Sequence, residues 1–221
     1  MNIIYEDNHL LVVEKPVNIP VQADDSNDPD LLTMLKDYLK EKYDKPGNVY
    51  LGLVHRLDRP VGGVMVFAKT SKAASRLSKV VADRKLQKTY LAIVEGNNIK
   101  KKDTLEDYLI KNSKTNTVTV TSQDKGKHAS LDYELLNTRD NLNLVKVNLH
   151  TGRSHQIRVQ FSSRNMPLWG DQRYNKNAKI HQQIALWSHI LSFPHPITKE
   201  VLTFTSEPPN NYPWNELMPD K

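Results

Sequence analysis

The first third of the chain alternates between two hydrophobic patterns, one typical of strands and one typical of helices. Apolar runs at residues 3–5 and 10–13 flank a polar Asp7-Asn8 turn and predict a strand pair. The segment Asp28-Pro29-Asp30 predicts the start of a helix, with Asp28 as the capping residue and Pro29 in the first helical position. The apolar stripe of this helix faces a core rather than a partner and contains Leu31, Leu32, Leu35, Tyr38 and Leu39.

A buried strand and a second helix are predicted next along the chain. Residues 64–68 are apolar without interruption, which is typical of a strand that is covered on both faces. Ser71 is the predicted cap of the following helix, whose Ala74, Leu77 and Val81 face inward.

From residue 86 onward the hydrophobic period shifts towards two, the period of strands with one buried face. The predicted strands cover residues 89–95, 105–111, 115–121, 129–136, 144–150, 184–193 and 201–205. Polar turns between consecutive strands make them antiparallel neighbours. So many strands with only a few helices predict an α+β fold rather than an alternating α/β fold. The proline-rich tail, residues 207–221, is expected to lie extended on the surface.

Composition excludes several functional classes but does not identify one. The chain has 221 residues, enough for one sizeable core or at most two small ones. Its formal charge of +6 and its pI near 9.3 favour a polyanionic partner. Because the chain has no cysteine, disulfides, cysteine-ligated zinc and thiol catalysis are excluded. No apolar run reaches the roughly 20 residues that span a bilayer, and the N-terminus lacks a signal-peptide pattern, so we expect a cytoplasmic protein.

One short segment combines a carboxylate with two guanidiniums. In His55-Arg56-Leu57-Asp58-Arg59, the positive charge of the flanking arginines favours the ionised form of Asp58. The arginines also present forks of donors that match phosphate oxygens. Taken alone, such a segment is more often a surface ion-pair cluster than a nucleophile beside a phosphate-binding site.

Two further segments change that interpretation. Lys88-Thr89-Tyr90-Leu91-Ala92 and the stretch from Thr151 to Arg158, T-G-R-S-H-Q-I-R, follow the first segment in order. Together the three resemble the sequence blocks of the RluA family of RNA pseudouridine synthases. The resemblance covers nearly the whole chain and extends to Lys15-Pro16, to Gly170-Asp171 with Tyr174, and to Phe193-Pro194-His195-Pro196.

The resemblance implies a fold and an activity. The implied fold is the pseudouridine synthase fold, an α+β domain with a mixed, mostly antiparallel sheet, a few flanking helices and a central active-site cleft. A single catalytic domain over residues 1–221 is expected, without the S4-like RNA-binding domain of many relatives. The implied activity is isomerisation of specific uridines to pseudouridine in structured RNA, a ribosomal or transfer RNA stem-loop. No metal, cofactor, membrane or obligate protein partner is implied, and we expect a monomer.

The resemblance also assigns roles to individual residues. Asp58 is the expected nucleophile, Tyr90 is the residue that stacks on the base and takes the C5 proton, and Arg158 pairs with Asp58. Arg56 is expected to fill the space that the flipped base vacates. Weaker candidates for RNA contacts, which fit ordinary surface polar residues equally well, are Arg59, Arg153, His155 and Gln156.

Some segments allow two interpretations. Residues 155–161 alternate like a strand, but a Ser154 cap and the family's pattern favour a helix. Val61-Gly62 stands where the family commonly has Thr-Ser, so two hydroxyls are missing from the turn behind Asp58. Basic side chains between residues 69 and 88 predict either an electrostatic track for RNA or a solvated helix face. They are Lys69, Lys72, Arg76, Lys79, Arg84, Lys85 and Lys88.

Two other functional classes fit less of the sequence. A non-catalytic RNA-binding module would explain the basic charge, but not the joint presence of Asp58, Tyr90 and Arg158. A metal-dependent hydrolase is suggested only by eight histidines, none of which belongs to an H-E-x-x-H pair. Product analysis distinguishes isomerised uridine from unchanged bound RNA and from metal-dependent cleavage.

Overall fold

The chain is organised as two compact units. The computed structural model describes residues 2–219. The first unit contains Met1–Gln87 and Ser188–Glu207, and the second contains Lys88–Trp187 and Pro208–Lys221. Each unit is therefore built from two separate stretches of sequence.

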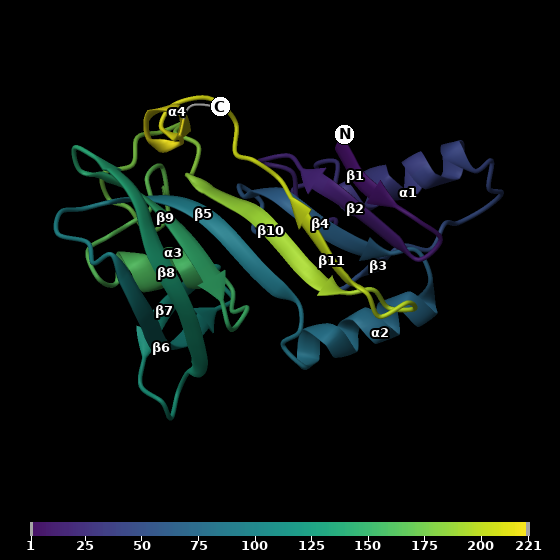
Figure 1. Cartoon of the computed structure of the whole chain (residues 1–221), viewed down its shortest axis with the longest axis horizontal. Helices are drawn as coiled ribbons and strands as arrows, with labels where there is room; N and C mark the ends of the chain where they lie inside the picture. Colours follow the sequence, from purple (N-terminus) through teal and green to yellow (C-terminus); the bar gives the residue numbers. More distant parts are fainter. Residues whose placement is uncertain (1, 220–221) are drawn as a thin grey trace. The chain divides into compact units, whose positions relative to one another are not determined.

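The first unit is built on a sheet whose strand order is β1-β2-β4-β10 (Figure 1). β11 pairs with β10, and β3 pairs with β4. The predicted strand pair at residues 3–5 and 10–13 is confirmed as antiparallel β1 and β2. The elements are β1 (Asn2–Glu6), β2 (Leu10–Lys15), α1 (Leu31–Lys42), β3 (Gly52–Leu53), β4 (Gly62–Ala68), α2 (Ser71–Ala82), β10 (Leu186–Pro194) and β11 (Val201–Thr205).

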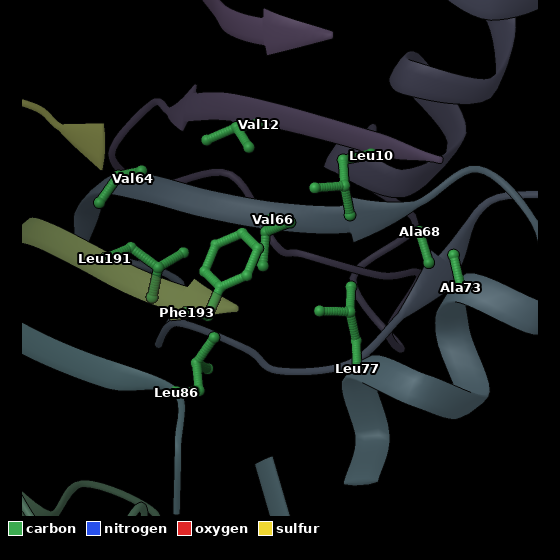
Figure 2. Close-up of a cluster of buried hydrophobic side chains, with 10 residues drawn as sticks. All are labelled: Leu10, Val12, Val64, Val66, Ala68, Ala73, Leu77, Leu86, Leu191 and Phe193. Carbon is green, nitrogen blue, oxygen red and sulfur yellow. The ribbon is translucent and has the colours of Figure 1, made fainter. Parts of the chain in front are cut away.

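One core cluster of the first unit lies between this sheet and α2 (Figure 2). Val12 of β2 pairs with Val66 of β4, and both belong to a cluster in which Phe193 of β10 and Leu77 of α2 are also buried. β4 is buried along its whole length, as its uninterrupted apolar run predicts. Burial of each large side chain of this kind contributes ~1.5–3 kcal/mol.

The predicted start of α1 is wrong by two residues. The cap is Asp30 rather than Asp28, and the Asp30 carboxylate accepts a hydrogen bond from Thr33 N at 3.0 Å. Leu31 N donates to the carbonyl oxygen of Pro20 at 2.9 Å. This tertiary contact determines where the helix begins, and it could not be read from the local pattern.

The predicted cap of α2 is wrong by one residue. Thr70 has an extended backbone and its hydroxyl accepts from Ala73 N at 3.1 Å, so Ser71 becomes the first helical residue. Ala73 and Leu77 are fully buried, whereas the predicted inward residue Ala74 is only partly buried. The helix therefore faces the core at a slightly different rotation from the predicted one.

The second unit is an antiparallel sheet with strand order β5-β9-β8-β6-β7 (Figure 1). Val159 of α3 packs against buried Leu109, Val118 and Ala129 of this sheet. The seven strands predicted from residue 86 onward are all present, and their ends shift by at most three residues. The elements are β5 (Gln87–Glu95), β6 (Lys102–Asn112), β7 (Thr117–Thr121), β8 (Lys127–Arg139), β9 (Leu142–Leu149), α3 (Gln156–Ser162) and α4 (Trp214–Leu217).

The helical interpretation of residues 155–161 is confirmed by α3, but the predicted Ser154 cap is wrong. His155 occupies the cap position in the left-handed region, with φ of 51°, and its side chain makes no capping hydrogen bond. Gln156 closes the preceding turn instead, because its side-chain oxygen accepts from Arg153 N at 3.0 Å.

The tail also differs from the prediction. Residues 214–217 form the short helix α4, in which Trp214 and Leu217 are buried. Asn137 Nδ2 of β8 donates to the carbonyl oxygen of Leu217 at 2.8 Å, and Arg139 forms an ion pair with Glu216. These contacts hold the tail against β8, whereas prolines alone predict an extended chain. Residues 220–221 of the predicted tail lie outside the described residues.

The predicted α+β class is confirmed by sheets with few helices in both units. The single catalytic domain, the central cleft and the cytoplasmic location stay predictions. Within residues 2–219, no helix combines the length and apolar character needed to cross a bilayer.

Candidate active site

Asp58 lies on a tight turn between β3 and β4. Its carbonyl oxygen accepts from Val61 N at 2.9 Å, and its side chain is partly exposed. Behind the turn, Gly63 has φ of +116°, and a Cβ there would lie 2.2 Å from the carbonyl oxygen of Ser188. Glycine is therefore required where β4 leaves the turn and passes close to β10.

A buried lysine braces this turn from inside the first unit. The Lys15 ammonium is fully buried and donates to the carbonyl oxygens of Pro16 and Arg59 at 2.9 Å and of Val61 at 2.8 Å. Burial lowers the pKa of Lys15 to about 7, and the nearby Asp58 charge acts in the opposite direction. Lys15 thus grips the backbone on the C-terminal side of Asp58 and is a positioning residue for it.

The two arginines that flank Asp58 have different surroundings. Arg56 is exposed. Arg59 is tied to the segment before α1, where it forms ion pairs with Asp28 and, at 3.8 Å, with Asp24. Its guanidinium also donates to Ser26 Oγ at 3.0 Å. The structure therefore gives Arg59 a role within the protein, while its contact with RNA stays a prediction.

Tyr90 lies in β5 of the second unit, opposite Val147 of β9, and only 6% of its surface is exposed. Lys88 lies two residues earlier on the same strand. Because side chains alternate along a strand, Lys88 and Tyr90 point to the same face of the sheet.

Arg158 of α3 is held by a carboxylate that the sequence interpretation had given no role. Its Nε and Nη2 donate to the two carboxylate oxygens of Asp171 at 2.9 and 2.8 Å. Both side chains are buried, and the Arg158 guanidinium lies 5.1 Å from the centre of the Tyr174 ring. This bidentate pair fixes the plane of the guanidinium. The predicted pairing of Arg158 with Asp58 stays a prediction.

Tyr174 also orients His155. Tyr174 Oη accepts from Val118 N at 2.9 Å and forms a second hydrogen bond with His155 Nδ1, which lies 2.7 Å away. Burial raises the pKa of Tyr174, which keeps the phenol protonated. This hydrogen bond fixes the His155 ring next to the turn that precedes α3, where His155 itself has a left-handed backbone.

Gln156 and Arg153 shape the loop before α3. Gln156 is 3% exposed, and its side-chain oxygen accepts from Thr151 Oγ1 at 2.8 Å as well as from Arg153 N. Its Nε2 donates to the carbonyl oxygen of Ser130 at 3.0 Å. Arg153 is exposed, and its Nε donates to the carbonyl oxygen of His128. Gln156 thus holds the loop in shape, and contacts of both residues with RNA stay predictions.

The predicted site residues divide between the two units. Arg56, Asp58 and Arg59 belong to the first unit, together with Lys15. The second unit contains the remaining predicted residues, Tyr90, Arg153, His155, Gln156 and Arg158. Their assembly around one uridine stays a prediction.

Comparisons with known proteins identify the family. Residues 9–163 match the family model described as RNA pseudouridylate synthase. The chain is 33% identical over 227 residues to ribosomal large subunit pseudouridine synthase D of Zymomonas mobilis, covering 96% of this chain and 70% of that protein. The chain belongs to the RNA pseudouridine synthase family. It is an isomerase that acts on RNA, and the predicted membership of the RluA family is confirmed.

Other relatives agree with this assignment. The synthase is 33% identical over 205 residues to the uncharacterized RNA pseudouridine synthase YhcT of Bacillus subtilis, covering 91% of this chain and 67% of that protein. The human protein RNA pseudouridylate synthase domain containing 4 has the same fold. Its structure superposes with a TM-score of 0.80 at 21% identity and covers 94% of this chain and 88% of that one. The predicted pseudouridine synthase fold is therefore confirmed.

Sequence interpretation missed the supporting residues of the synthase. Lys15, Asp171 and Tyr174 were part of the resemblance, but they received no role. Their partners belong to other segments of the chain: Val61 is 46 positions from Lys15, and Arg158 is 13 positions from Asp171. Among residues 2–219, no group of three or more His, Asp or Glu side chains is arranged to hold a metal.

Proposed function

We propose that this synthase isomerises a uridine in structured RNA, with Asp58 as the nucleophile. The observation that carries the proposal is the turn at Asp58, whose backbone is braced by Lys15 and which contains the family's H-R-L-D-R block. Relatives named for the ribosomal large subunit make ribosomal RNA the first substrate to test, with transfer RNA as the second.

The proposed reaction exchanges one bond to ribose C1′ for another. Asp58 attacks C1′, and the bond from C1′ to base N1 breaks, so that its electron pair leaves with the uracil. The base turns, C5 bonds to C1′, and Asp58 departs as a carboxylate. A proton leaves C5 and one is taken up at N1, so the product is an isomer and no oxidant or group donor is needed.

Tyr90 and Arg158 support this chemistry in the proposal. Tyr90 stacks on the base and accepts the C5 proton. A phenol with an ordinary pKa of about 10 needs help from its surroundings for that role. Arg158 pairs with Asp58 and orients its carboxylate. The bidentate contact with Asp171 supports this role, because it holds the guanidinium in one orientation.

The assay of the purified protein is direct. Ribosomal and transfer RNA from a deletion strain are incubated with the synthase, digested to nucleosides and analysed for pseudouridine. New pseudouridine at a defined position supports the proposal. Bound but unchanged RNA would favour an RNA-binding module, and cleaved RNA would favour a hydrolase.

Arg56 is proposed to stabilise the flipped base. We expect Arg56→Ala to lower the single-turnover rate more on a stem-loop than on a strand whose uridine is already unstacked. Flipping costs a few kcal/mol, and each ~1.4 kcal/mol changes the rate about tenfold. Arg59→Ala is the matched comparison, since Arg59 is tied to Asp24 and Asp28, and it should slow both substrates equally. Equal losses for Arg56→Ala on the two substrates would contradict a flipping role.

The isomerisation is proposed to need no metal or cofactor. We expect full activity in excess EDTA on a short RNA whose own fold does not depend on magnesium. The measurement is pseudouridine formed per enzyme before and after dialysis against the chelator. Loss of activity that zinc restores would contradict this expectation.

A further inference from the structure

Two lysines whose side chains are largely buried, Lys15 and Lys69, have clear partners. Lys15 donates to three carbonyl oxygens. Lys69 donates to Glu6 at 2.8 Å and to the carbonyl oxygen of Asp7 at 2.7 Å. Both contacts offset the loss of water around a charge. The Lys69 contacts also show that this member of the predicted basic track is committed within the protein.

Lys88 is the exception. Its side chain is only partly exposed, and burial lowers the pKa of its amine. Within residues 2–219 its ammonium makes no hydrogen bond or ion pair. A partly desolvated charge without a partner is unfavourable, so proteins seldom keep one unless it binds something.

The position of Lys88 indicates what it binds. Lys88 of β5 lies opposite Leu149 of β9. It points to the same face as Tyr90, which is about 7 Å further along β5. Its Nζ lies against the loop before α3, where a Cβ on Gly152 would be 3.3 Å away. Glycine leaves room beside the ammonium, and exposed Arg153 follows directly. An anion at this place would meet Lys88 next to the tyrosine that is proposed to stack on the target base.

We propose that Lys88 binds a backbone phosphate of the RNA beside the target uridine. The inference rests on the proposed role of Tyr90, because a base stacked there brings its own or a neighbouring phosphate within reach of Lys88. The phosphate provides the negatively charged partner that the Lys88 ammonium lacks in the free protein. Lys88 therefore contributes to RNA binding, whereas Asp58, Tyr90 and Arg158 perform the chemistry.

The test compares Lys88→Met with Lys111→Met, an exposed lysine on β6 of the same unit. RNA affinity is measured at several salt concentrations. Removing one phosphate contact should reduce the slope of log K against log salt by about 0.7–0.9, which corresponds to roughly 5- to 8-fold weaker binding at 0.1 M salt. Lys111→Met should leave the slope unchanged. An equal reduction in both variants would show a general charge effect and overturn the proposal.

Thermal unfolding separates binding from a structural role. Because methionine removes an uncompensated charge, the midpoint for Lys88→Met should equal or exceed that of the unchanged protein. A lower midpoint together with an unchanged salt slope would make Lys88 a structural residue and overturn the proposal. These readouts need no turnover, so a protein that makes no pseudouridine would fail the proposed function without failing this test.

Two further measurements identify the anion. A stem-loop with a neutral methylphosphonate next to the target uridine should bind the unchanged protein more weakly, while Lys88→Met should be insensitive to that modification. Calorimetry with inorganic phosphate in the absence of RNA tests for a free anion. Binding of inorganic phosphate through Lys88, with no methylphosphonate effect, would overturn the assignment to RNA.

Discussion

Asp58→Asn should abolish pseudouridine formation and leave the fold and RNA binding intact. Asparagine fills the same space but cannot attack C1′, so the rate should fall by roughly 10⁴-fold or more, as in other enzymes that lose their nucleophile. The turn itself should persist, because its hydrogen bonds come from the backbone and from Lys15. Single-turnover assays, RNA affinity and the thermal midpoint measure the three quantities separately.

Asp25→Asn is the control for this experiment. Asp25 is an exposed aspartate of the same unit, so its variant should retain full activity. Substantial turnover by purified Asp58→Asn would reject Asp58 as the nucleophile. Loss of activity accompanied by loss of RNA binding would instead assign Asp58 to the grip on the substrate.

Local patterns were sufficient for the elements but not for their ends. The period of two predicted the strands of the second unit because one face of each strand is buried and the other is not. Asp28 and Asp30 are equally good caps by type, and only the tertiary contact at Leu31 distinguishes them. Serine is by type the better cap than threonine, so the local sequence favoured Ser71 over Thr70. α4 packs against β8, and the hydrogen-bonded residues Asn137 and Leu217 are 80 positions apart, so this helix had no local signal.

In the candidate site too, some residues could be assigned from the sequence and others only from the structure. Asp58, Tyr90 and Arg158 could be proposed because their neighbours in sequence match a family. The residues that support them could not be assigned in this way, since a buried ammonium or carboxylate finds its partner only in the folded chain. In the sequence, Lys15 is an ordinary lysine at the end of a strand, and its contacts with the carbonyl oxygens of Arg59 and Val61 form only in the folded chain. The role of Asp171 is likewise visible only in the structure, where Arg158 of α3 donates to both of its carboxylate oxygens.

Arg158→Ala should reduce the chemical step by several orders of magnitude with little change in RNA affinity. The variant removes the guanidinium that is proposed to pair with Asp58 and orient its carboxylate. Arg158→Lys should recover little of the activity, because an ammonium cannot form the bidentate contact with Asp171. The single-turnover rate measures the chemical step, and equilibrium binding of the same RNA measures the affinity.

Asp171→Asn completes a double-mutant cycle with Arg158→Ala. On its own it should lower the single-turnover rate about 100-fold, since a guanidinium that is no longer clamped lies in the wrong orientation part of the time. It should also lower the stability, because a buried arginine that loses a bidentate carboxylate costs about 3–5 kcal/mol. Assays are therefore run well below the midpoint of thermal unfolding.

The decisive outcome is the behaviour of the double variant. If Asp171 acts only through Arg158, adding Asp171→Asn to Arg158→Ala should cause no further loss of rate. A second 100-fold loss in that background would show that Asp171 acts on the reaction independently. Asp171 would then be more than a positioning residue, and the bidentate pair would no longer explain how Arg158 is held for catalysis.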